Sequence, residues 1–246
     1  MEKKVPLIEM KNIHKWYGRI HALKGVDFKV NNKDIVGLVG DNGAGKSTLI
    51  KILSGVYMPD KGEIFFKGKK VKFYSPRDAI RMGIETIHQS TGLVDTMDIK
   101  RNIFLGREPT RRFGPVKWLD LKKMARDSLV ALKNIGLELN SPSINVEELS
   151  GGQRQGVAIA RAVYFKTNLL LLDEPTNNLS VKETEKVLQY IQELKNQGTS
   201  SVFITHNLYH VYPIADRIVI LKLGEKIGEF KKDETSVEEL IDLIKS

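Results

Sequence analysis

Short apolar runs alternate with longer stretches of mixed polarity along the chain, and this alternation predicts a mixed α/β protein. The runs near residues 35–39 and 169–172 contain almost no polar side chain, which is typical of strands buried on both faces of a sheet. Strands are expected near residues 8–13, 26–30, 35–39, 63–66, 169–172, 202–205 and 218–221.

A helical subdomain is expected from about residue 90 to about residue 163, inside one domain that spans residues 1–246. Within it, residues 106–119 are predicted to form an irregular insertion, because prolines and glycines interrupt the pattern there. The sequence shows no internal repeat and no tract of low complexity.

Capping boxes mark the starts of two further helices. Ser180 is followed three residues later by Glu183, and Ser236 by Glu239, a pattern in which each side chain bonds the other's backbone N–H group. The helix after Ser180 is expected to carry its apolar side chains on one face: Val187, Leu188, Ile191 and Leu194.

A glycine-rich loop follows the strand expected at residues 35–39 and precedes a helix-forming stretch. It reads Gly40-Asp41-Asn42-Gly43-Ala44-Gly45-Lys46-Ser47-Thr48. Glycines let the backbone curl with its N–H groups pointing inward, which creates an anion site at the helix N-terminus. We predict that this loop binds nucleotide phosphates, with Lys46 on the β- and γ-phosphates and Ser47 on Mg²⁺. A glycine turn with a solvated lysine is the simpler alternative.

Two acids end a run of four leucines, in Leu169-Leu170-Leu171-Leu172-Asp173-Glu174-Pro175. A core strand of this kind delivers both carboxylates at its end. Asp173 is then placed to hold Mg²⁺ through its water shell, and Glu174 to polarise the water that attacks the γ-phosphate. Alternatively, one acid only caps the turn before Pro175.

The loop, the two acids and the pentapeptide Leu149-Ser150-Gly151-Gly152-Gln153 resemble the nucleotide-binding subunit of ABC transporters. The resemblance runs from about residue 7 to about residue 221. It implies an α/β fold with the P-loop NTPase core of ABC ATPases, in which an antiparallel β subdomain and a helical subdomain accompany a RecA-like core. It also implies ATPase activity with ATP and Mg²⁺.

Three isolated side chains match further positions of that family. Tyr17 would stack on adenine, with an ordinary strand aromatic as the alternative. Gln89 would join the Mg²⁺ shell or orient the water, in a loop that moves against a membrane partner, unless it is a solvated loop residue. His206 follows a predicted strand, where α/β sheets place ligands, although it could equally cap or fill the core. The resemblance thus assigns catalysis to Lys46, Gln89, Glu174 and His206.

The pentapeptide opens an amphipathic segment at residues 153–164, so Ser150, Gly151, Gly152 and Gln153 offer a second anion site. The resemblance implies that this signature faces the γ-phosphate held by another subunit, so that two chains enclose two ATP molecules head to tail. A homodimer is expected, and the alternative is the glycine-rich start of a plain surface helix. Where many family members carry an aspartate, this chain has Ser180, which leaves communication between the two sites open.

Four further stretches resemble the ATPases of monosaccharide importers: Lys51-Ile52-Leu53-Ser54-Gly55-Val56-Tyr57, Tyr74-Ser75-Pro76-Arg77-Asp78-Ala79, Ile87-His88-Gln89 and Asn102-Ile103-Phe104-Leu105-Gly106-Arg107-Glu108. Local structure explains part of them, because Ser75-Pro76 starts a helix and Gly106 ends one. That branch commonly joins two ATPase halves in one chain. This sequence has one phosphate loop and one signature, so a copy of itself or a separate subunit would complete the pair.

Composition narrows the setting of the protein. The chain has 39 basic and 30 acidic residues, with basic clusters at residues 67–72 and 107–126, which we interpret as solvated surface rather than a nucleic-acid platform. It has no cysteine, and neither a signal peptide nor an apolar run long enough to span a membrane is expected.

Together these features predict the energising subunit of a monosaccharide importer at the cytoplasmic face of the cell membrane. Its partners would be a permease, contacted through the Gln89 region, and indirectly a sugar-binding protein, with no nucleic acid. The alternatives are a soluble ABC-type ATPase that acts on ribosomes or DNA, and a regulatory module that never hydrolyses ATP.

Overall fold

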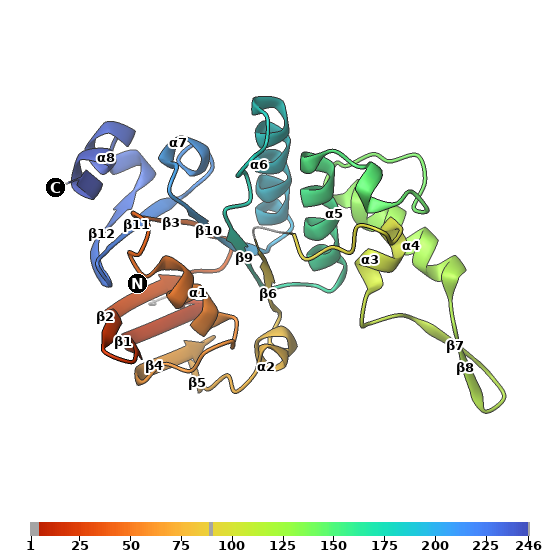
Figure 1. Cartoon of the computed structure of the whole chain (residues 1–246), viewed down its shortest axis with the longest axis horizontal. Coiled ribbons are helices and arrows are strands. Elements are labelled where there is room, and N and C mark those ends of the chain that lie inside the picture. Colours follow the sequence, from red (N-terminus) through yellow and green to blue (C-terminus); the bar gives the residue numbers. More distant parts are fainter. Residues whose placement is uncertain (1–4, 89–90, 246) are drawn as a thin grey trace. The chain divides into compact units, whose positions relative to one another are not determined.

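The computed structural model describes residues 5–88 and 91–245, which form two compact units (Figure 1). The first unit comprises residues 5–86, 167–175 and 195–245 of the described chain, and the second comprises 87–88, 91–166 and 176–194. The segment expected as a helical subdomain lies in the second unit, which also takes in residues 176–194.

A mostly parallel sheet forms the centre of the first unit. Its strand order in the described chain is β12 (Glu225–Lys231), β11 (Arg217–Lys222), β3 (Ile35–Val39), β10 (Ser200–Thr205), β9 (Leu169–Asp173) and β6 (Ile84–Ile87). Strands β11, β3, β10 and β9 pair in parallel, whereas β12 pairs antiparallel with β11. Every residue of β3 and β10 is buried, as the apolar runs predict.

An antiparallel sheet supplies the other layer of this unit, in the order β2 (Ile20–Val30), β1 (Ile8–Tyr17), β4 (Lys61–Phe66) and β5 (Lys69–Val71). One apolar cluster joins side chains of both sheets with those of helix α1 (Lys46–Leu53). Leu49, Ile50 and Leu53 of α1 are buried in this cluster. The phosphate-loop helix is therefore fixed by the packing of the core.

The remaining helices of the first unit are α2 (Pro76–Arg81), α7 (Leu208–Val211), the 3₁₀ turn η2 (Lys232–Glu234) and α8 (Val237–Lys245). Pro76 begins α2 after the Ser75 cap, as predicted. The predicted capping box before α8 is also present, since Ser236 N–H donates to Glu239 and Glu239 N–H to Ser236.

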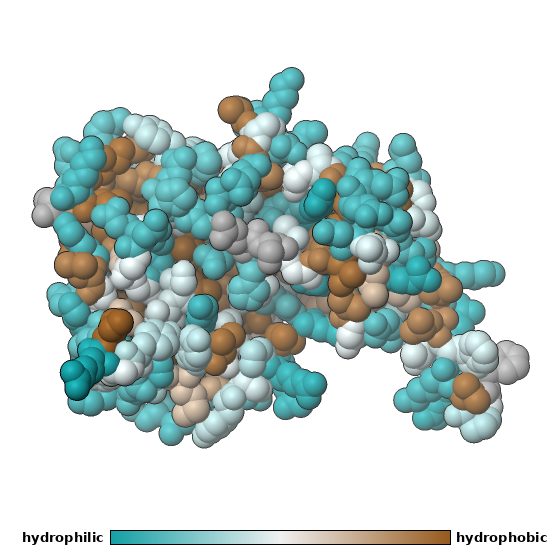
Figure 2. All heavy atoms as spheres, viewed as in Figure 1, coloured by the Kyte–Doolittle hydropathy of each residue, from teal (hydrophilic) through white to brown (hydrophobic). Residues whose placement is uncertain are grey.

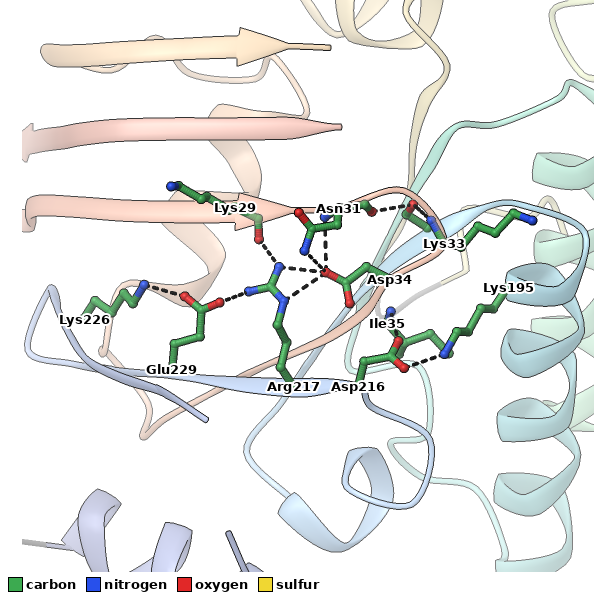
Figure 3. A network of polar contacts seen from close by, with 11 residues as sticks. Lys29, Asn31, Lys33, Asp34, Ile35, Lys195, Asp216, Arg217, Lys226 and Glu229 are labelled. Carbon is green, nitrogen blue, oxygen red and sulfur yellow. Dashed lines mark hydrogen bonds and ion pairs between the residues drawn. The ribbon is translucent and has the colours of Figure 1, made fainter. Parts of the chain in front are cut away.

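Buried charges tie the amino ends of β3 and β11 together (Figure 3). The Arg217 guanidinium donates to Asp34 Oδ2 at 2.9 Å from Nε and pairs with Glu229, and both Arg217 and Asp34 are less than a tenth exposed. Asp216 accepts from Ile35 N–H at 2.8 Å and from the Lys195 ammonium. This network, which the sequence does not predict, lies at the opposite end of the strands from the phosphate loop.

The second unit consists of α3 (Ile99–Phe104), α4 (Leu121–Asn134), the 3₁₀ turn η1 (Val146–Glu148), α5 (Gly151–Tyr164) and most of α6 (Val181–Asn196). The Phe104 ring packs edge-on against Tyr164 at 4.7 Å between centroids. The Tyr164 hydroxyl donates to Asp127 at 2.9 Å, so α3, α4 and α5 share one aromatic and polar contact.

The prediction of an irregular insertion at residues 106–119 is wrong. Residues in this stretch form a β-hairpin of β7 (Thr110–Phe113) and β8 (Val116–Leu119), in which Arg111 lies opposite Trp118. The residues between the strands, Gly114 and Pro115, act as the turn rather than as breaks in a loop.

Among the described residues no helix is both long and apolar enough to cross a bilayer.

Candidate functional site

The glycine-rich loop lies between β3 and α1, at the carboxyl end of the parallel strands. Gly40 has a φ of +145°, and a Cβ atom there would come within 2.0 Å of the Leu221 carbonyl oxygen. Only glycine fits this close approach of two backbones. Ala22 and residues 42–48 line a pocket around the loop.

The Lys46 ammonium folds back over the loop, where it donates to the carbonyl oxygens of Gly40 at 2.6 Å and Asp41 at 2.9 Å. Burial lowers the pKa of Lys46, while the nearby carboxylates of Glu174, Asp41 and Asp173 act in the opposite direction. The structure therefore brings the loop lysine and both acids that end β9 into one electrostatic site.

Hydrogen bonds from the adjacent strand hold the Glu174 carboxylate. Its Oε2 accepts from the Thr205 hydroxyl at 3.0 Å, and its Oε1 accepts from His206 N–H at 3.1 Å. His206 Nδ1 lies 2.7 Å from the same Oε1, which fits an imidazole that carries its proton on Nδ1. The Glu174 side chain is 16% exposed, so it keeps limited access to water.

The backbone around Glu174 has an unusual shape that directs its side chain. Its φ is +49°, in the left-handed region, and its N–H donates to the Ile204 carbonyl at 3.0 Å. Strain of this kind persists only where neighbouring contacts over-determine it. The end of β9 is thus bent toward β10, which supplies Thr205 and His206.

The predicted Mg²⁺ ligands offer oxygen donors, which suit this ion. Ser47 is exposed at the start of α1, and Asp173 ends β9 half-buried. Among the described residues no group of three or more His, Cys, Asp or Glu side chains could hold a metal. Mg²⁺ usually keeps several waters and takes one or two protein ligands together with phosphate oxygens, so the donors present fit it.

The remaining predicted side chains are distributed over both units. Tyr17, at the end of β1, is 38% exposed and its ring packs edge-on against Tyr57. An accessible aromatic face suits stacking on a base. Gln89 falls outside the described residues.

The signature residues lie in the second unit, at the N-terminus of α5. Ser150 is the N-cap, and its hydroxyl accepts from Gln153 N–H while Gln153 Oε1 accepts from Ser150 N–H. Gly151 and Gly152 are closely packed, because a Cβ atom would lie 2.6 Å from the end of the Leu179 side chain in the first case and 3.0 Å from Glu183 Cβ in the second, so a larger residue would require these neighbours to shift.

Glu183 of α6 occupies part of this helix N-terminus. Its Oε1 accepts from Gly152 N–H at 3.1 Å, and its Oε2 accepts from Ser180 N–H at 3.0 Å. The Gly152 and Ser180 N–H groups, followed by the Ser180 and Ser150 hydroxyls, lower the pKa of Glu183 to about 2. The predicted box between Ser180 and Glu183 is therefore present, and its acid also bonds the signature.

We expect Glu183→Ala to lower the free energy of unfolding by about 1 kcal/mol at pH 7, the usual cost of losing a helix cap. The carboxylate stabilises the fold above its unfolded pKa of 4.5, and this contribution fades as the pH falls through the folded value of about 2. Urea unfolding at pH 7 and pH 2 measures both effects. Glu185→Ala, an exposed change on the same helix, is the control, and equal losses from both variants would contradict the role of Glu183.

Sequence reasoning missed two participants in these sites. The apolar pattern identifies Thr205 only as the last residue of a strand, but its hydroxyl holds Glu174 and also accepts from Asn207 N–H, so it shapes the His206 turn. Glu183 was predicted to cap α6 alone. The spacing of Ser180 and Glu183 signals the cap, but nothing in the sequence signals a bond to a glycine 31 residues earlier.

The loop on a strand-to-helix turn, with acids at the end of another parallel strand of the same sheet, defines a P-loop nucleotide-binding ATPase. The profile of the family described as "ABC transporter" matches residues 23–177. The chain is 47% identical over 240 residues to the xylose/arabinose import ATP-binding protein of Sulfolobus acidocaldarius, covering 98% of this chain and 94% of that protein. It belongs to the ABC transporter family, as one of its ATPase chains.

Two further relatives are also named as sugar import ATP-binding proteins. The fructose import ATP-binding protein of Rhizobium meliloti is 43% identical, with 90% of this chain and 87% of that protein covered. A ribose import ATP-binding protein of Agrobacterium fabrum is 39% identical over 97% of this chain, which spans only 46% of that longer protein.

Solved structures share the fold. A nucleotide-free ATP-binding cassette of an ABC transporter superposes with a TM-score of 0.83 at 25% identity, over 98% of this chain and 96% of that chain. A dimeric cassette bound to ADP and phosphate gives a TM-score of 0.75 at 28% identity, over 92% and 98%. The predicted ABC ATPase fold is confirmed.

Proposed function

We propose that this chain is the ATP-hydrolysing subunit of an importer for a monosaccharide. The observation that carries the proposal is the Glu174 carboxylate, oriented by Thr205 and His206 and close enough to Lys46 to act on its pKa. A positioned base beside a phosphate loop is the arrangement that hydrolysis of a γ-phosphate requires.

In the proposed reaction, the N–H groups of the loop and the Lys46 ammonium bind the β- and γ-phosphates. Lys46 exchanges its carbonyl partners, Gly40 and Asp41, for phosphate oxygens. Glu174 accepts a proton from the attacking water, and His206 contacts the γ-phosphate from the end of β10. Ser47, Asp173 and Gln89 would hold Mg²⁺, which neutralises charge on the phosphates when bound.

Tyr17→Ala tests the stacking proposed for the base. Loss of one base–aromatic stack costs about 1–3 kcal/mol, so we expect ATP to bind roughly five- to 150-fold more weakly. Titration with a fluorescent ATP analogue measures the change, and Tyr74→Ala, which removes a tyrosine that is 72% exposed, is the control. An affinity unchanged in Tyr17→Ala would exclude this residue from the base site.

In this proposal, the signature at the N-terminus of α5 binds a second ATP molecule, which another copy of the chain holds. Ser150, Gly151, Gly152 and Gln153 would meet its γ-phosphate with N–H groups and a hydroxyl at the positive end of the helix. The dimeric solved relative supports this assembly. ATP then links the two subunits, and hydrolysis releases them.

The relatives named for xylose, arabinose, fructose and ribose import support a monosaccharide as the cargo. Closure of the dimer would be transmitted to a permease through the Gln89 region, and a sugar-binding protein would deliver the substrate to that permease. The chain would accordingly work on the cytoplasmic face of the cell membrane as a peripheral subunit.

Purification from its own cells in mild detergent, followed by mass spectrometry, tests the assembly. A polytopic permease together with a sugar-binding protein supports the importer and names candidate sugars. Ribosomal or DNA-repair proteins without a membrane partner would overturn it.

A further inference from the structure

The β7–β8 hairpin exposes apolar and basic side chains together. Trp118 is 66% exposed and Val116 51%, and Leu119 and Leu121 are also exposed. Between residues 105 and 126 the sequence has seven basic and two acidic residues. Figure 2 shows hydrophobic and hydrophilic side chains mixed on this hairpin, apart from the helices of its own unit.

The base of the hairpin is fixed, whereas its strands project. Asp120, one of the two acids, is buried, pairs with Arg111 and accepts from Lys123 N–H at 3.0 Å. Its own N–H donates to the Pro109 carbonyl at 2.8 Å. The strands are therefore held at their root by α4, and the negative charge of Asp120 is used there rather than at the tip.

The register of the two strands places apolar and basic side chains on each of the two faces of the hairpin. Arg111 lies opposite Trp118 on one face, and Arg112 opposite Lys117 on the other, where Leu119 also lies two residues along. A protein partner packed on a ribbon desolvates one face and favours an apolar centre with a polar rim. The headgroup layer of a membrane surrounds both faces and accommodates indole rings and cationic side chains at the same depth.

We propose that this hairpin inserts into the surface of a membrane that contains anionic lipids. Arg112 and Lys117 meet the lipid phosphates, and Trp118 and Val116 enter the boundary between headgroups and acyl chains. This contact is separate from the ATPase chemistry and from the permease contact proposed for Gln89. It needs neither nucleotide nor a partner protein.

Vesicle binding by the full chain tests the proposal. Co-sedimentation is measured with phosphatidylcholine vesicles with and without a quarter of phosphatidylglycerol. We expect binding only to the anionic vesicles, weakening as salt rises, together with a blue shift of tryptophan fluorescence that Trp118→Ala removes. Equal binding to both kinds of vesicle, or none to the anionic kind, would overturn it.

Two charge-reversal variants test whether the hairpin, rather than the net charge of the protein, is responsible for vesicle binding. Each basic residue near an anionic surface contributes about fivefold in partitioning, so Arg112→Glu/Lys117→Glu is expected to weaken binding at least 25-fold. Lys69→Glu/Lys72→Glu makes the same change of charge on an exposed basic cluster of the other unit and should leave binding within about fivefold. Equal losses from both pairs would overturn the hairpin site. The proposal would also be overturned if Arg112→Glu/Lys117→Glu bound vesicles like the parent protein but lost binding to a permease or RNA that the parent protein binds.

Discussion

Glu174→Gln is expected to lower the rate of ATP hydrolysis by a factor of about 10²–10⁴ while ATP still binds. The amide keeps the size of the side chain and can still contact Thr205 and His206, but it has no carboxylate to accept the proton of the attacking water. Phosphate release from purified protein measures the rate. Retention of activity within about threefold would show that Glu174 is not the base.

The same variant should change assembly. With hydrolysis blocked, ATP stays between the subunits, so gel filtration with ATP and Mg²⁺ should show a dimer that Glu174→Gln stabilises relative to the parent chain. Only monomer under these conditions would count against the head-to-tail arrangement. Glu225→Gln, on an exposed residue at the start of β12, is the matched control for both measurements.

Arg217→Met is expected to lower the free energy of unfolding by about 3–5 kcal/mol, the largest effect on stability among these predictions. It removes the guanidinium from Asp34 and Glu229 and leaves the buried Asp34 carboxylate without a cation. The thioether still fills part of the space of the arginine stem. The midpoint of urea unfolding at pH 7 measures the loss.

A second change separates loss of charge pairing from loss of packing. Asp34→Asn in the Arg217→Met background removes the isolated charge, so the double variant should be more stable than Arg217→Met alone. Lys226→Met removes a more exposed partner of Glu229 and should cost less than about 1 kcal/mol. If Arg217→Met and Lys226→Met cost the same, the network contributes little.

The sequence predicted the parallel core and the phosphate loop because both depend on local signals. Apolar runs identify β3, β9 and β10. A glycine-rich turn between a strand and a helix is typical of a phosphate-binding loop. Strands β5, β6, β7, β8 and β12 were not predicted. In β12 exposed and half-buried residues alternate and charges are frequent, so its pattern is that of an edge strand rather than of a core strand.

The hairpin was misjudged for a different reason. The prolines and glycines of residues 109–115 predict breaks in the chain, whereas Gly114 and Pro115 make a short turn between two strands in register. Long-range partners were not accessible to sequence rules at all. Arg217 pairs with Asp34 across 183 residues, and Glu174 is oriented by side chains 31 and 32 residues away.

The position of β3 between β10 and β11 determines when the nucleotide site can form during synthesis. The loop after β3 also depends on a part of the chain that is made late. Gly224, between β11 and β12, donates its N–H to the Ala44 carbonyl. At 5–20 residues per second, roughly ten to forty seconds separate the synthesis of Asp34 from that of Arg217, 183 residues later. Until β10 is made both edges of this apolar strand lack their partners, and the edge that β11 covers stays open until the end of the interval. The newly made chain is therefore most exposed to aggregation before it can bind its first ATP.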